Sequence, residues 1–173
     1  MSEPWLSGAH SHLDPVLRPI LFSLEQSSAD LRQWTEGISD DQLWAEPFAL
    51  GSLGFQLRHI AGSVDRLFTY AQNNSLSQEQ LAFLRNEKIP GATLTELLDQ
   101  IASVFDRVAT QVPQIPIAQI KDHRGVGRKQ LPTTVIGLLI HIAEHTQRHV
   151  GQAIVTVRVL KSSGSTTTLN QNG

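Results

Sequence analysis

Three histidines form a ladder near the carboxyl end of the chain, in the stretch HIAEHTQRHVGQ at residues 141–152. They are His141, His145 and His149, so one histidine recurs every four residues. On an α-helix, residues four apart differ in direction by about 40° and lie one turn apart along the axis. Two adjacent histidines can therefore bind one metal ion. The whole ladder extends over about 12 Å, which is too long for all three to reach the same ion.

A third ligand is expected from another helix, because two histidines leave a metal site incomplete. The stretch LRHIAGSVDR supplies His59, which lies within a pattern of apolar residues. A neutral histidine on a buried stripe must satisfy both ring nitrogens, and a metal ion satisfies one of them. An isolated pair of histidines at this spacing is more often part of a polar helix face, but the third histidine favours a metal site. The residues alone leave two pairings open on the ladder: His145 with His149, or His141 with His145.

Composition restricts the metal and its chemistry. The chain has no cysteine, so only nitrogen and oxygen atoms can hold a metal, and any reacting thiol must arrive with a substrate. All-nitrogen ligation suits zinc, nickel or iron and argues against magnesium or calcium; we favour zinc. Three imidazoles leave open positions on a divalent ion, and such an ion lowers the pKa of a bound water or thiol. The expected chemistry is therefore activation of a nucleophile at neutral pH.

Apolar periodicity predicts the helices that must position these residues. Four segments have the spacing of long helices, at about 14–37, 52–73, 93–112 and 133–160. Capping patterns of the type S-x-x-Q predict two short connecting helices, at about 40–45 and 78–86. The segment from 113 to 131 is expected to be a structured loop, and no run of residues has a strand pattern. The predicted fold is all-α, a four-helix bundle with short connecting helices.

Length and charge set the remaining expectations. We expect one domain over residues 1–160 and a polar, flexible tail over 161–173. Lys and Arg number 14 against 16 Asp and Glu, so no charge excess favours nucleic acid. The most apolar window, residues 135–143, is too short to span a membrane, and the N-terminus lacks a secretory pattern. The protein is expected to be cytoplasmic, with a small-molecule substrate and with neither nucleic acid nor membrane as a partner.

The order of these motifs resembles that of the DinB/YfiT-like family of metalloenzymes. A histidine early in the second helix, here His59 in LRHIAGSVDRL, is followed far downstream by H-x-x-x-H-x-G-Q, here from His145 to Gln152. The usual H-R-G-Q ending appears as HVGQ, which removes a basic residue beside the last ligand. The resemblance covers about residues 15–160. It implies a DinB-like four-helix bundle, a homodimer, and a divalent metal on His59, His145 and His149.

The resemblance also implies a range of functions. The family includes metal-dependent thiol S-transferases and a maleylpyruvate isomerase that uses a low-molecular-weight thiol. We therefore expect a metal-dependent transferase or isomerase that activates such a thiol. A metal-dependent hydrolase is the first alternative, but it needs a general base, and Glu144 points about 100° away from His145. A non-catalytic helical bundle is the second alternative.

Several other residues are candidates for a role around the metal. The resemblance favours His145 and His149 as the pair, so His141 is expected to lie one turn from the ligands, where it could orient one of them or relay a proton. Arg66 follows His59 by seven residues, about 20° away on the same face, and could hold an anionic substrate or be an ordinary surface residue. Gln152 has the same relation to His145; the resemblance implies that it could orient a ligand or a substrate, and an ordinary surface glutamine is the alternative. Gly62 and Gly151 each cost their helix about 1 kcal/mol, which close helix approach or room for a substrate would explain.

Overall fold

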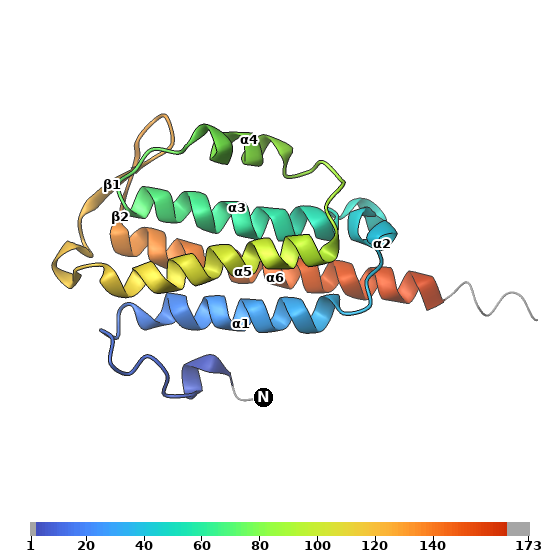
Figure 1. Ribbon diagram of the computed structural model, residues 1–173, viewed down its shortest axis with the longest axis horizontal. Coiled ribbons are helices and arrows are strands. Elements are labelled where there is room, and N and C mark those ends of the chain that lie inside the picture. The colour runs from blue at the N-terminus through green and yellow to red at the C-terminus, as the bar shows by residue number, and fades with distance from the viewer. Residues whose placement is uncertain (1–2, 166–173) are drawn as a thin grey trace, which may run out of the picture.

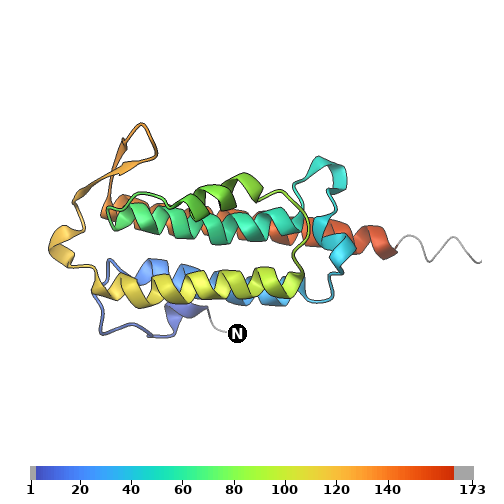
Figure 2. The same ribbon diagram turned by 45° about the horizontal axis from the view of Figure 1, so that its top comes forward.

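The computed structural model describes residues 3–165, with side chains to residue 163. Its four long helices are α1 (Arg18–Thr35), α3 (Leu53–Ala71), α5 (Leu94–Gln111) and α6 (Val135–Ser165). They run side by side along the long axis of the molecule (Figures 1 and 2). The predicted four-helix bundle is confirmed.

Two short helices, α2 (Asp40–Trp44) and α4 (Gln78–Asn86), lie where the capping patterns predict them. Four of the helices, α2, α3, α4 and α5, begin after a serine or threonine whose side chain accepts a hydrogen bond from the backbone N–H three residues on; these residues are Ser39, Ser52, Ser77 and Thr93. Such caps satisfy N–H groups that the first helical turn leaves unpaired. Single 3-10 turns complete the helical elements: η1 (Pro4–Leu6), η2 (Pro47–Ala49), η3 (Val112–Gln114) and η4 (Ile117–Gln119).

The ends of the first and last helices differ from the prediction. α1 begins at Arg18 and has Pro19 in its first turn, where a proline costs no hydrogen bond, so it starts about four residues later than expected. α6 continues to Ser165, so the first residues of the predicted tail are helical. Lys161 explains the extension in part, because its Nζ donates to the carbonyl of Glu36 at 2.7 Å, just after α1. The rest of the predicted tail, residues 166–173, lies outside the described residues.

A β-hairpin replaces part of the predicted loop. Strand β1 (His123–Val126) pairs antiparallel with β2 (Leu131–Thr134), so the expectation of no strand was wrong here. Each strand has four residues, and Gly125 stands opposite Pro132, two residue types that are depleted in strands. This composition hides the alternation by which strands are recognised. The hairpin leads directly into α6, and Arg124 Nε donates to the last carbonyl of α3, that of Ala71, at 2.8 Å.

The core lies between the four long helices. α3 packs against α6 on one side and α5 on the other, and α1 closes the ring by packing against both α5 and α6. The largest fully buried side chains come from every long helix and include Leu21, Leu31, Leu57, Ile60, Phe68, Leu97, Ile101, Leu139 and Ile142. The consequence for function is that α3, which carries His59, lies directly beside the histidine ladder of α6.

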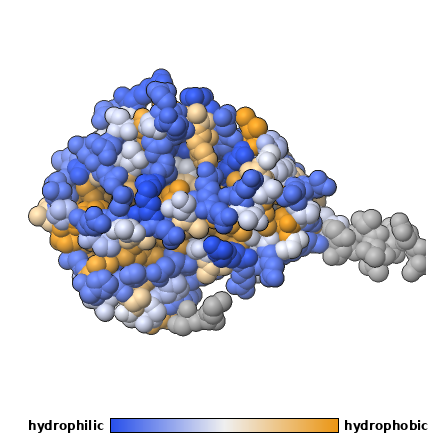
Figure 3. Space-filling view, in the orientation of Figure 1, coloured by the Kyte–Doolittle hydropathy of each residue, from blue (hydrophilic) through white to orange (hydrophobic). Residues whose placement is uncertain are grey.

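Hydrophilic residues cover most of the face shown in Figure 3, with hydrophobic residues in patches between them. Among the described residues, no helix is long and apolar enough to cross a membrane.

The homodimer that the resemblance implies stays a prediction.

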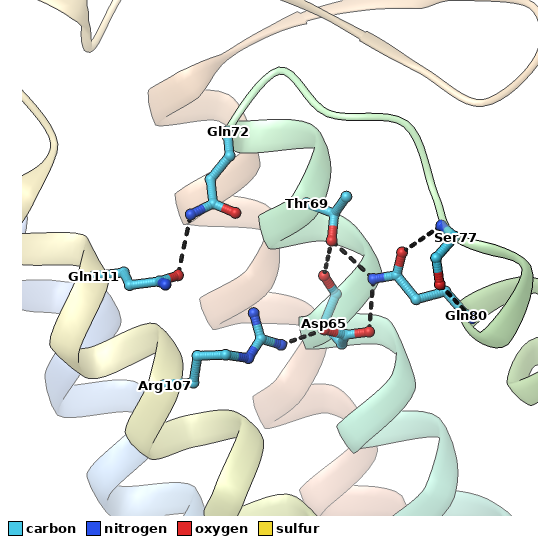
Figure 4. Close-up of polar contacts among 7 residues, drawn as sticks. All are labelled: Asp65, Thr69, Gln72, Ser77, Gln80, Arg107 and Gln111. Carbon is cyan, nitrogen blue, oxygen red and sulfur yellow. Dashed lines mark hydrogen bonds and ion pairs between the residues drawn. The ribbon is translucent and has the colours of Figure 1, made fainter.

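A polar cluster ties α4 and α5 to α3 (Figure 4). At its centre is Asp65 of α3, which forms an ion pair with Arg107 of α5. Gln80 of α4 donates to Asp65 Oδ2 at 2.7 Å and to Thr69 Oγ1 at 2.8 Å. One carboxylate therefore holds two neighbouring helices in register with the helix that carries His59.

We expect Asp65→Ala to lower the free energy of unfolding by about 1–3 kcal/mol, because it removes the carboxylate that pairs with Arg107 and one of the two acceptors of Gln80. Urea unfolding of the variant and the wild type measures this difference. Asp99→Ala is the matched control, since Asp99 lies exposed on α5. Equal stability of the two variants would mean that the Asp65 contacts contribute nothing to folding.

Candidate metal centre

The packing of α3 against α6 brings the three predicted ligands together. One ring nitrogen from each of His59, His145 and His149 lies within 4.8 Å of the other two. His59 Nε2 and His145 Nε2 are 3.0 Å apart, and the ring centroids of His59 and His149 are 4.3 Å apart. All three residues are half-buried. These three histidines could hold a metal ion at a half-buried position.

Hydrogen bonds from the chain orient two of the three rings. His59 Nδ1 lies 2.8 Å from Glu87 Oε2, and His149 Nδ1 lies 2.7 Å from Gln56 Oε1. A carboxylate or amide oxygen can only accept, so the proton is on Nδ1 of both rings. Each Nε2 is then left with a free lone pair, which is the form that binds a metal.

This arrangement fits a divalent metal ion. His59 Nε2 and His145 Nε2 face each other across 3.0 Å, close enough for both to bind one cation. His145 Nδ1 is buried and has no hydrogen-bond partner among the described residues, so Nε2 is the nitrogen through which this ring takes part in the cluster. Three neutral nitrogens form a donor set that suits zinc, nickel or iron.

Burial favours the neutral form of two of the ligands, His145 and His149. It lowers the pKa of His149 to about 4, with a further contribution from the neighbouring His59. The pKa of His145 is lowered for the same two reasons. Burial alone would raise the pKa of Glu87, but the hydrogen bond from His59 and the charge of Arg66 outweigh it and lower that pKa. At neutral pH the site therefore contains the uncharged imidazoles of His145 and His149, together with the Glu87 carboxylate behind His59.

The lowered pKa of His149 predicts a pH dependence of folding in the metal-free protein. A histidine in the unfolded chain has a pKa near 6.5, so below that pH the unfolded state binds a proton that the folded state does not. The free energy of unfolding is therefore expected to fall as the pH drops from about 6.5 to 4, by on the order of 2 kcal/mol from this residue once solvent screening of the half-buried ring is taken into account. Urea unfolding at a series of pH values, with a chelator present, measures the effect.

The comparison that isolates His149 is its replacement by glutamine. His149→Gln should lose the part of the pH dependence that His149 contributes and keep the part that His145 contributes, whose pKa is also lowered. His12→Gln, at an exposed position in the N-terminal arm, should keep both parts. A wild type and a His149→Gln variant with the same pH dependence would contradict the assignment.

The structure places the other predicted residues around this centre. His141 lies outside the cluster: it is exposed, its Nδ1 is 2.7 Å from Glu144 Oε1, and its ring centroid is 5.2 Å from that of His145. Arg66 is only 8% exposed, so the alternative that it is an ordinary surface residue was wrong. Its Nη1 lies 2.8 Å from Glu87 Oε1. A substrate role for Arg66 stays a prediction.

Gln152 is exposed and helps to line a cavity of about 480 Å³ beside the centre. The same cavity is lined by Gln56, which contacts His149, and by Arg148 of α6. The predicted role of Gln152 in orienting a ligand or substrate stays a prediction.

Two residues that contact the ligands were not predicted from the sequence. Glu87 lies in NEKIP, a polar stretch at the end of a short helix, where nothing indicates burial. Gln56 precedes His59 by three residues, so both lie on one face of α3, and this spacing is the signal that could have drawn attention to it. Its actual partner, however, is His149 on the other helix.

Comparison with known proteins gives a family match and a similar solved structure. The model of the DinB superfamily matches residues 23–153. The chain is also similar to the solved structure of YfiT from Bacillus subtilis, described as a probable metal-dependent hydrolase with an unusual four-helix bundle topology. That match has a TM-score of 0.62 at 17% identity and covers 82% of this chain and 86% of the other, which supports the fold. No curated protein matches the chain in sequence.

Proposed function

Because the chain belongs to the DinB superfamily, we propose that it is a metal-dependent enzyme that activates a low-molecular-weight thiol for S-transfer or isomerisation of a small molecule. The observation that carries the proposal is the convergence of His59, His145 and His149, whose ring nitrogens lie within 4.8 Å of one another. Zinc is the expected metal, with nickel or iron as alternatives.

A divalent ion with three protein ligands keeps open positions and lowers the pKa of a thiol or water bound there. The chain's own part is to hold the ligands and keep them neutral. Glu87 and Gln56 accept the Nδ1 protons of His59 and His149, which leaves the Nε2 lone pair of each ring free to bind the metal. Partial burial then keeps His145 and His149 uncharged at neutral pH.

The distribution of carboxylates favours a thiol over water as the nucleophile. Attack by water is helped by a general base close to the metal. Among the described residues, Glu87 is engaged by His59 and Arg66, and Glu144 is 43% exposed and paired with His141 and Arg148. A thiol needs no such base once the metal has lowered its pKa below the pH of the solution.

The cavity beside the centre supports a small organic substrate. Its volume of about 480 Å³ is within the usual range for small-molecule sites. Leu50 and Val155 contribute apolar surface, while Gln56, Arg148 and Gln152 contribute polar groups.

The direct test is a transfer assay with the zinc- or nickel-loaded protein. Glutathione, coenzyme A and cysteine would each be combined with a haloaromatic electrophile, and loss of free thiol would be followed. We expect metal-dependent transfer with at least one thiol and none with His149→Ala. A loaded protein that transfers none of these thiols would count against the proposal.

Hydrolysis is the second candidate, and the description of YfiT favours it. The same loaded protein would be tested on ester, amide and phosphoester substrates without thiol. Metal-dependent hydrolysis in the absence of thiol would establish this alternative. Full stability after chelation, together with weak and unselective metal uptake, would instead point to a non-catalytic bundle.

A further inference from the structure

Glu87 is a buried carboxylate that joins a predicted metal ligand to a separate helix. It follows α4 directly and is 4% exposed, whereas no residue within α4 itself is fully buried. One of its oxygens lies 2.8 Å from His59 Nδ1, and the other lies 2.8 Å from Arg66 Nη1. The deepest contact of the α4 segment with the bundle is therefore made at the histidine of α3.

The backbone of α3 is shaped for this contact at Gly62. A Cβ atom at Gly62 would lie 2.6 Å from Phe83 Cε1 of α4, 2.6 Å from Arg66 Nη1 and 2.8 Å from Glu87 Oε1. All three are side-chain atoms, so an added methyl group would displace this network and not the helix backbone. Of the two explanations for this glycine, close helix approach is the correct one. Gly151, by contrast, has nothing within 4 Å of the added atom.

We infer that Glu87 is a positioning residue through which metal binding at His59 is coupled to the docking of α4 on α3. This inference rests on the proposed metal site. A carboxylate that accepts the second N–H of a ligating histidine fixes the orientation of the ring and makes it a stronger ligand. The coupling is reciprocal, so a cation on Nε2 strengthens the bond from Nδ1 to Glu87 and holds α4 in place.

A second contact of α4 separates this role from general packing. Gln80 also joins α4 to α3, through Asp65 and Thr69, whereas the His59 ring nitrogens contact Glu87 and His145 instead. Loss of the Gln80 contacts should loosen α4 without changing the acceptor on the ligand. Gln80→Ala is therefore the control for Glu87→Gln.

Zinc affinity, measured by equilibrium dialysis of protein without an affinity tag, tests the positioning role. Glu87→Gln removes the charge, and Gly62→Ala displaces the carboxylate but keeps its charge. Both are expected to weaken zinc binding by about 10–100-fold. Gln80→Ala and Gly151→Ala should bind zinc like the wild type. Gly151→Ala is the control for Gly62→Ala, because it adds the same methyl group to a helix at a position where nothing lies within 4 Å of the added atom. Circular dichroism confirms that each variant is folded.

Hydrogen exchange of the amides in residues 78–87 tests the coupling. In the wild type, zinc should slow this exchange; in Glu87→Gln, saturating zinc should not. Wild-type zinc affinity in Glu87→Gln, or an equal loss in Gln80→Ala, would overturn the role of Glu87 and leave the metal site standing. A wild type that binds no zinc would overturn the proposed function itself, and this inference with it.

Discussion

Replacing His149 with alanine is expected to abolish stoichiometric metal binding, whereas replacing His141 with alanine is expected to leave it unchanged. The His149 ring lies within the cluster, and its Nδ1 is held by Gln56, while His141 is exposed and held by Glu144 outside the cluster. Elemental analysis of protein without an affinity tag measures the result. We expect close to one metal per chain in the wild type and in His141→Ala.

The same pair of variants decides between the two pairings on the ladder. Both remove one histidine from α6 and both leave His145 in place, so nonspecific loss of imidazole affects them equally. A His141→Ala protein without metal, beside a His149→Ala protein that retains it, would show that His141 and His145 are the ligand pair. Circular dichroism of both variants excludes unfolding as the cause.

Zinc is expected to raise the thermal stability of the wild type substantially. His59 and His145 are 86 positions apart in the chain, so only the folded state brings their nitrogens within 3.0 Å. A ligand that binds only the folded state at 100 times its dissociation constant adds about 2.7 kcal/mol. For a domain of this size, that corresponds to a rise of about 5–10 °C in the melting temperature. Thermal unfolding with zinc, and again after addition of a chelator, measures the shift.

The control for this prediction is His145→Ala, which removes the nitrogen facing His59. Its melting temperature should not respond to zinc at the same concentration. An equal rise in this variant would show that zinc stabilises the protein through other groups, and that result would favour the non-catalytic bundle.

The positions of the three histidines could be predicted because most of the information is local. The spacing of His145 and His149 fixes their relative direction on any helix, and His59 lies on the apolar face that must pack against a neighbour. Spacing alone did not decide between the two pairs on the ladder; the resemblance did. The structure adds the register of α3 against α6, in which Gln56 lies opposite His149.

The partners of the ligands could not be predicted because they depend on tertiary packing. Glu87 is buried only because α4 folds back onto α3 at Gly62, and neither fact follows from local sequence. Arg66 was correctly placed on the face of His59, but its counter-ion comes from the same distant segment. The hairpin was missed because its strands are short and contain Gly125 and Pro132.

The most direct test of the metal centre is X-ray absorption spectroscopy of the zinc-loaded protein. The account predicts one zinc per chain with three imidazole nitrogens at about 2.0–2.1 Å and the remaining position taken by solvent oxygen. If one of the variants His59→Ala, His145→Ala and His149→Ala still retains zinc, its zinc should have one imidazole fewer than in the wild type. A zinc ion surrounded only by oxygen atoms, or one whose imidazoles are unaffected by these replacements, would contradict it.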